Sequence, residues 1–186
     1  MRFWNSLLVV TFVTLVFVCS CQSKQTNNNQ LKDFVGSQFV LLTDSMINFK
    51  TEASIKKTNK YTYVVFVDSI DCSECAINSM TLWADDLDMM DALESGVLDY
   101  AFIFSPRNCA KKRIVNKIKE DCVFPEYTYV DTAEVTLRHN PNIPRNRAMH
   151  TFLVDNYRNV VIVGSPIYNN QVKQLFKKIM GQSDIK

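Results

Sequence analysis

The stretch from Tyr61 to Met90 constrains the fold of this chain more than any other part of it. Residues 61–67 form an apolar run rich in β-branched and aromatic side chains, without Gly or Pro, which predicts a buried strand. A short polar turn follows, and Cys72-Ser73-Glu74-Cys75 then opens a segment whose apolar residues have helical spacing. The pattern therefore predicts two cysteines at the point where a strand passes into a helix.

This position has chemical consequences for the two cysteines. The first turn of a helix has unpaired N–H groups and the positive end of the helix dipole, and both stabilise a thiolate. We therefore expect Cys72 to be the more exposed, attacking thiol and Cys75 to be the more buried thiol that resolves a mixed disulfide. A CxxC motif between a strand and an amphipathic helix indicates a redox pair. A structural disulfide and a metal site are the alternatives that the motif leaves open.

The beginning of the chain predicts export from the cytosol. Arg2 and the apolar run from Leu7 to Val18 are typical of a signal peptide, here over residues 1–20, and the run is too short to span a bilayer comfortably. The residues that follow, Val18-Cys19-Ser20-Cys21, are similar to the bacterial lipobox, which implies lipidation of Cys21. An ordinary secretory signal is the alternative. Residues 21–30 are polar and predict a tether, so we expect a membrane-anchored, periplasm-facing protein in an oxidising compartment.

The rest of the chain alternates predicted strands and helices. A long helix is expected from Cys72 to about Gly96, and residues 131–148 are expected to form a loop. Residues 31–49 predict a lead-in segment followed by an edge strand or hairpin. The alternation predicts a parallel sheet with right-handed crossovers, and the last two strands predict an antiparallel hairpin. Further strands are predicted at residues 97–105, 126–130, 151–155 and 160–163, and helices at residues 108–120 and 169–180.

The composition excludes some classes of function. The net charge is +2 and no large basic block exists, so we expect no nucleic-acid partner. The chain has only 4 Gly residues and lacks the glycine-rich motifs that cradle phosphates, and we expect no diffusible cofactor. We also expect no metal site, because no second CxxC accompanies the first. Cys109 and Cys122 bracket a predicted helix and would lie about 20 Å apart, which is too far for a disulfide, so their role stays open.

The predicted layout, with CxxC at the start of the first long helix, resembles the thioredoxin fold. The chain is similar to the membrane-tethered thioredoxin-like lipoproteins of bacteria, which are related to the thioredoxins of cytochrome c maturation. Two motifs carry the resemblance: strand, CxxC and helix over Val64 to Met90, and the strand with an acidic end over Thr151 to Asp155. The resemblance implies a three-layer α/β/α domain over residues 31–182, with a central mixed sheet, an N-terminal extension and a tail at residues 183–186.

The resemblance also implies a function. It predicts a thiol–disulfide oxidoreductase of the cell envelope in which Cys72 and Cys75 are catalytic, the partners are extracytoplasmic thiol or disulfide proteins, and a membrane partner supplies electrons. The alternative is a thioredoxin-fold lipoprotein that acts as a non-catalytic binding or scaffold module.

The chain departs from the family pattern near the predicted site. Met149 occupies the place of the family's cis-proline before the late strand. His150 next to it is a candidate to approach the cysteines and assist proton transfer, and a strand-edge histidine without a role is the alternative. Asp71 and Glu74 bring negative charge beside the attacking thiol, which favours a reducing couple over an oxidising one.

Overall fold

The computed structural model describes residues 29–49, 60–68, 72–106 and 110–181. Within these residues a six-stranded sheet has the order β1-β4-β3-β2-β5-β6. The strands are β1 (Ile47–Asn48), β2 (Tyr61–Val67), β3 (Leu98–Phe104), β4 (Thr128–Val130), β5 (Thr151–Asp155) and β6 (Val160–Val163). The α-helices are α2 (Ser73–Ser79), α3 (Thr81–Ala84), α4 (Leu87–Glu94), α5 (Lys111–Asp121), α6 (Val135–His139) and α7 (Asn170–Met180). Short 3-10 turns are η1 (Thr43–Ser45), η4 (Pro125–Tyr127) and η5 (Arg147–Met149).

The sheet is mixed, as the sequence predicts. Strands β2, β3 and β4 run parallel, with α2 to α4 connecting the first two and α5 connecting the second two. Strand β5 runs antiparallel to β2 and forms an antiparallel hairpin with β6. The predicted βαβ succession and the late hairpin are therefore confirmed. The final helix α7 also begins and ends as expected, because the Asn169 side chain caps its first turn and Gly181 ends it at φ 72°.

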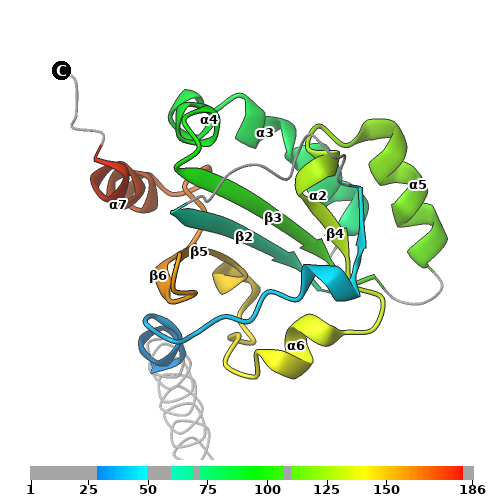
Figure 1. Cartoon of the computed structure of the whole chain (residues 1–186), viewed down its shortest axis with the longest axis horizontal. Coiled ribbons are helices and arrows are strands. Elements are labelled where there is room, and N and C mark those ends of the chain that lie inside the picture. Colours follow the sequence, from blue (N-terminus) through cyan, green and yellow to red (C-terminus); the bar gives the residue numbers. More distant parts are fainter. Residues whose placement is uncertain (1–28, 50–59, 69–71, 107–109, 182–186) are drawn as a thin grey trace, which may run out of the picture.

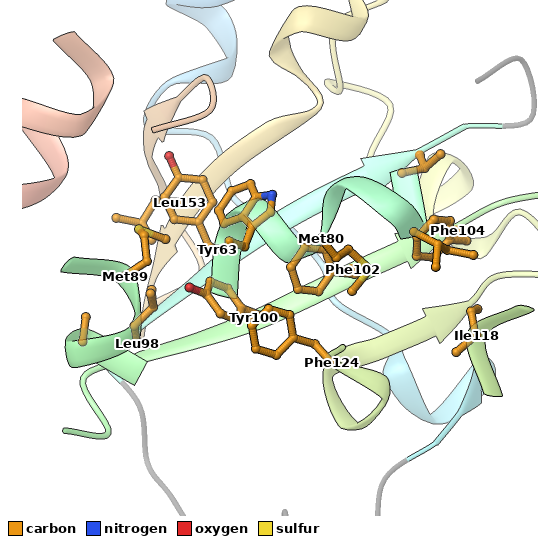
Figure 2. Packing of buried hydrophobic residues seen from close by; sticks show 14 of the residues in the cluster. Tyr63, Met80, Met89, Leu98, Tyr100, Phe102, Phe104, Ile118, Phe124 and Leu153 are labelled. Carbon is orange, nitrogen blue, oxygen red and sulfur yellow. The ribbon is translucent and has the colours of Figure 1, made fainter. Parts of the chain in front are cut away.

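One face of the sheet carries an aromatic core covered by α2, α3, α4, α5 and α7 (Figure 1). Figure 2 shows this packing, with Tyr63, Tyr100 and Phe102 pointing from the strands toward the helices. The Trp83 ring from α3 meets those of Tyr63 and Tyr100 edge to face, with centroids 5.4 and 5.8 Å away. Aromatic burial of this kind supplies most of the driving force for folding a sheet of this size.

The opposite face is covered by the beginning of the described chain and by α6 (Figure 1). Residues 29–34 are helical, and the rings of Phe34 and Phe39 both contact Phe152 edge to face, with centroids 5.0 Å apart in each pair. Asn140, after α6, fixes this layer to α6 by hydrogen bonds with the backbone N–H and C=O of Val40. Together the two faces make the three layers that the sequence predicts.

The boundaries differ from the prediction in three places. Residues 29–34 are helical, and the edge strand of this region is β1, with Gln38 making only an isolated bridge to Asn159. The long helix after Cys72 is broken, because the backbone is extended at Asp86 (ψ 105°), whose carboxylate accepts the Met89 N–H at 3.3 Å and starts α4.

Residues 131–148 are not all loop, since they contain α6. The carboxylate of Asp131 accepts the N–H groups of Val135 (3.0 Å) and Thr136 (2.8 Å), so a buried acid at the end of β4 starts that helix.

Several predictions fall wholly or partly outside the described residues. They are the signal peptide at residues 1–20, Cys21, most of the tether at residues 21–30, Asp71, Cys109 and the tail at residues 183–186. Among the described helices, none has the length and apolar character needed to cross a membrane.

Candidate functional site

Cys72 and Cys75 form a disulfide at the beginning of α2, with their Cα atoms 5.2 Å apart. Cys72 is the N-cap residue of the helix, and its Sγ accepts the backbone N–H of Cys75 at 3.2 Å. The predicted position of the pair, where the central strand β2 gives way to a helix, is therefore confirmed. Because an N-cap acceptor satisfies a free N–H of the first turn, the same geometry stabilises a thiolate at Cys72 once the disulfide is reduced.

Both cysteines are exposed to solvent. Cys75 is therefore not a buried thiol, and the helix geometry gives the reason. The buried side of α2 is formed by Ser73 and Ile77, which are four residues apart and lie above one another. Cys75 lies midway between them in sequence and so projects from the other side of the helix. A partner protein can therefore reach either sulfur atom.

Glu74, between the two cysteines in sequence, makes an ion pair with Arg113 of α5. The Nε atom of Arg113 lies 2.7 Å from Oε1 of Glu74, and the side chains are 71% and 39% exposed, respectively. The negative charge that the sequence places beside the attacking sulfur is thus partly balanced by a cation from a distant segment. The role of Arg113 is not predictable from the sequence, because the ion-pair partners are 39 residues apart and no local pattern links them. The basic character of α5 is the only signal.

Met149 and His150 lie at the same edge of the sheet as the cysteine pair. Strand β5 runs antiparallel to β2, so the residues before β5 lie beside the carboxyl end of β2. The Phe66 N–H donates to the His150 carbonyl at 2.9 Å, and the ring of His150 packs on Phe66. The structure therefore brings Met149 and His150 to the end of β2 that leads into the disulfide. Met149 is half-buried as the last residue of η5, and the described residues contain no cis peptide bond.

The buried imidazole of His150 has a fixed orientation. Its Nε2 lies 2.8 Å from the Pro144 carbonyl oxygen, so Nε2 carries the hydrogen and donates it. Its Nδ1 is buried and has no hydrogen-bond partner among the described residues. The ring contacts Phe66, whose side chain packs in the core on the face of the sheet opposite α2, so the imidazole has a structural position at this edge.

Cys122 is a free cysteine and takes no part in the disulfide. It is partly buried beneath α2, with its Sγ 3.7 Å from the Met80 sulfur and 3.4 Å from the Thr128 hydroxyl. Burial raises the pKa of its thiol, although the Thr128 hydroxyl acts in the opposite direction. In the described part of the chain no three His, Cys, Asp or Glu side chains come together as a metal site would require.

Comparison with known proteins shows similarity at the level of fold. No family model and no curated protein sequence matches the chain. A conserved protein of unknown function from Bacteroides fragilis is 18% identical, with a TM-score of 0.50 over 78% of this chain and 96% of that one. A thioredoxin-like protein from Bacteroides caccae is 9% identical, with a TM-score of 0.50 over 87% of this chain and 55% of that one. A domain of a possible thiol-disulfide isomerase from Cytophaga hutchinsonii is 13% identical, with a TM-score of 0.49 over 80% of this chain and 97% of that one.

The likeness to the Bacteroides caccae protein shows that the chain has a thioredoxin-like α/β fold. Within this fold the chain has a Cys72–Cys75 pair at disulfide distance.

Proposed function

We propose that this thioredoxin-fold chain is a thiol–disulfide oxidoreductase of the cell envelope that reduces disulfides of extracytoplasmic proteins. The observation that carries the proposal is the exposed Cys72–Cys75 disulfide at the junction of β2 and α2. A disulfide that only stabilises the fold does not require exposed cysteines. These two cysteines are exposed and lie beside the end of the central strand, where ligands commonly bind in sheets with parallel strands. The described state is the oxidised one, and the dithiol is the form that reduces a substrate.

The proposed reaction has two exchange steps. The Cys72 thiolate attacks one sulfur of the substrate disulfide, forming a mixed disulfide and releasing the other substrate sulfur as a thiolate, which takes up a proton. The Cys75 thiol loses its proton and attacks the Cys72 sulfur, which breaks the mixed disulfide and releases the second substrate thiol. Two electrons have then passed from the protein to the substrate, and the Cys72–Cys75 disulfide has formed. A dithiol of a membrane partner returns two electrons and two protons to restore the starting state.

The surroundings of the pair support this chemistry. The Cys75 N–H is in place to donate to the Cys72 sulfur, so the attacking thiolate is stabilised without any rearrangement of the helix. Glu74 favours a reducing couple, with Arg113 moderating its effect, and Asp71 adds a second negative charge by its place in the sequence.

Turnover of insulin tests the proposal. The purified full-length chain is expected to reduce insulin with dithiothreitol as the electron source, and Cys72→Ser is expected to abolish that activity. Cys122→Ser is the matched control and should keep the full rate, because its sulfur is separate from the disulfide. A Cys75→Ser variant should trap a mixed disulfide with its substrate, identified by mass spectrometry. Equal rates for the parent and Cys72→Ser would rule out the proposed exchange reaction.

The proposed location depends on Cys21 and the segment before it. If the lipobox-like sequence is processed, the mature protein begins at Cys21 and is held on the membrane by lipid, with its domain facing the periplasm. Radiolabelled palmitate should enter the parent chain and not Cys21→Ser, and the variant should leave the membrane fraction. Label retained by Cys21→Ser would contradict the anchor.

A second candidate is a non-catalytic binding module with a thioredoxin fold. The observation that favours it is the segment before β5, where the turn η5 and Met149 stand in the place of the family's proline and reshape that side of the disulfide. Such a module would show no Cys72-dependent turnover in the insulin assay, while still binding its partner.

A further inference from the structure

Helix α5 lies directly beside the helix that carries the disulfide (Figure 1). The contact is fixed by the Arg113–Glu74 ion pair, at 2.7 Å, which joins the first turn of α5 to the first turn of α2. Ile114 and Ile118 are buried in the core and hold the other side of α5 against the sheet. The solvent-facing side of α5 therefore lies next to the helix that contains the two exposed cysteines.

This solvent-facing side of α5 is strongly basic. Four of its exposed residues are cations, which we call the α5 basic surface: Lys111, Lys112, Arg113 and Lys119. Arg113 stays 71% exposed despite its ion pair with Glu74. The other three make no ion pair with any described residue, whereas the nearby Lys117 is occupied by Asp121 at 2.6 Å. Apart from Arg113, which is paired with Glu74, the surface thus presents positive charge without an ion-pair partner in the described chain.

The charges on α5 run against what helix stability favours. A helix is stabilised by acidic residues in its first turn and basic residues in its last turn. In α5 the first turn has no acid and holds Lys111, Lys112 and Arg113, while Glu120 and Asp121 lie at the other end. The residue before the helix, Ala110, adds no side-chain cap. The ion pair with Glu74 compensates only Arg113 among these first-turn cations. Lys111 and Lys112 weaken the helix without an ion pair in the described chain, as expected of residues used by a partner.

We infer that the α5 basic surface is a docking site for an acidic segment of the substrate protein, close to the disulfide that is exchanged. The inference rests on the proposed function and specifies its substrate class. Opposite charges would steer the substrate to the correct side of the cysteine pair and raise the rate of encounter. Because the cations are exposed, added salt should screen the effect.

Exchange kinetics with two synthetic peptides test the inference. The peptides carry the same disulfide and differ only in having Glu or Lys residues on both sides of it. The reduced full-length chain should react several-fold faster with the acidic peptide at low salt, and the difference should shrink at high salt. Reversing three charges (Lys111→Glu, Lys112→Glu and Lys119→Glu) should remove or invert the preference.

The matched control reverses three exposed lysines elsewhere: Lys32→Glu, Lys60→Glu and Lys178→Glu. It changes the net charge equally and should keep the preference for the acidic peptide. Equal rates for both peptides, or the same preference in both triple variants, would overturn the docking site.

A binding measurement separates the docking site from the exchange reaction. Labelled versions of the peptides, with Ser in place of Cys, are titrated with the chain and followed by fluorescence anisotropy. Tighter binding of the acidic peptide, without any exchange, would keep the docking site and reject the proposed function. Binding to vesicles containing phosphatidylglycerol, with no preference between the peptides, would assign the surface to the membrane and overturn the inference.

Discussion

The ion pair of Glu74 and Arg113 brings opposite charges next to a disulfide, and its two charges act oppositely on a thiolate there. Arg113→Gln removes the cation and leaves the Glu74 carboxylate uncompensated. We expect iodoacetamide to alkylate Cys72 of the reduced variant about two- to threefold more slowly at neutral pH, because less of the thiol is ionised. Peptide-resolved mass spectrometry measures the rate.

The double variant Glu74→Gln with Arg113→Gln should recover the parent rate, which a merely structural role of Arg113 would not produce. Lys119→Gln, on the same helix but without an ion pair among the described residues, is the control for loss of charge. An unchanged rate in Arg113→Gln would show that the pair has no influence on the sulfur.

Cys122 is expected to be an inert thiol. Burial raises its pKa, so little thiolate exists at neutral pH, and access is limited by Met80 and Thr128. In the reduced chain, iodoacetamide should modify Cys72 at least about tenfold faster than Cys122. Comparable rates in peptide-resolved mass spectrometry would show that the Cys122 site opens readily.

For single residues, the sequence predicts the position of the two cysteines well and the contacts of the residues around them poorly. The place of the disulfide follows from local order, because a strand, a turn and a helix in succession leave few alternatives. The exposure of Cys75 and the ion pair of Glu74 depend on which side of α2 meets the core and on where α5 packs. Both depend on tertiary packing, which no local sequence pattern indicates.

Two helices that are far apart in the sequence, α4 and α7, are joined by charge. Lys173 of α7 lies 2.6 Å from Asp86 and 3.2 Å from Asp88, and Lys177 lies 3.1 Å from Asp88. Partial burial by itself would raise the pKa of the Asp88 carboxyl, but the two lysines outweigh it and lower that pKa below its ordinary value of 3.8. Asp86 and Asp88 thus have a specific structural role between α4 and α7.

Lys173→Ala should lower the free energy of unfolding by about 0.5–1 kcal/mol at pH 7, the range for pairs that are only partly buried. A carboxyl with a lowered pKa contributes stability above its ordinary pKa and loses it as the pH falls through the folded value. The difference between variant and parent should therefore shrink below about pH 4. Urea denaturation across this pH range measures it, with the exposed Lys178→Ala as control. A difference that is constant down to pH 2 would contradict the role of Asp88.

The order of elements was predictable because each strand and most helices carry their own signal of apolar spacing. The break in the long helix after Cys72 and the start of α6 were not predictable. Asp86 and Asp131 start helices by accepting backbone N–H groups, and an acid in a polar stretch looks the same in sequence whether or not it caps a helix.

For the molecule as a whole, the beginning of the domain is part of the core. Phe34 is 2% exposed and packs edge to face against Phe152 in the middle of the sheet. Phe34→Ala should lower the free energy of unfolding by about 3 kcal/mol through lost burial and the cavity left behind. Val35→Ala is the control, because this neighbour is 45% exposed and should be near neutral. Thermal or urea unfolding that shows no difference between these variants would mean that the second layer is not needed for stability.

The first segment of the described chain is also attached to one end of the sheet. The Gly36 N–H donates to the Val160 carbonyl and the Val160 N–H donates to the Ser37 carbonyl, which ties the segment to β6, the outermost strand at that end, and its rings pack on the face opposite α2 and α5. If residues before it are fastened to a lipid bilayer, as we propose, the chain enters the domain in the layer opposite α2. The attachment would then leave the layer that contains the two sulfur atoms accessible to other proteins.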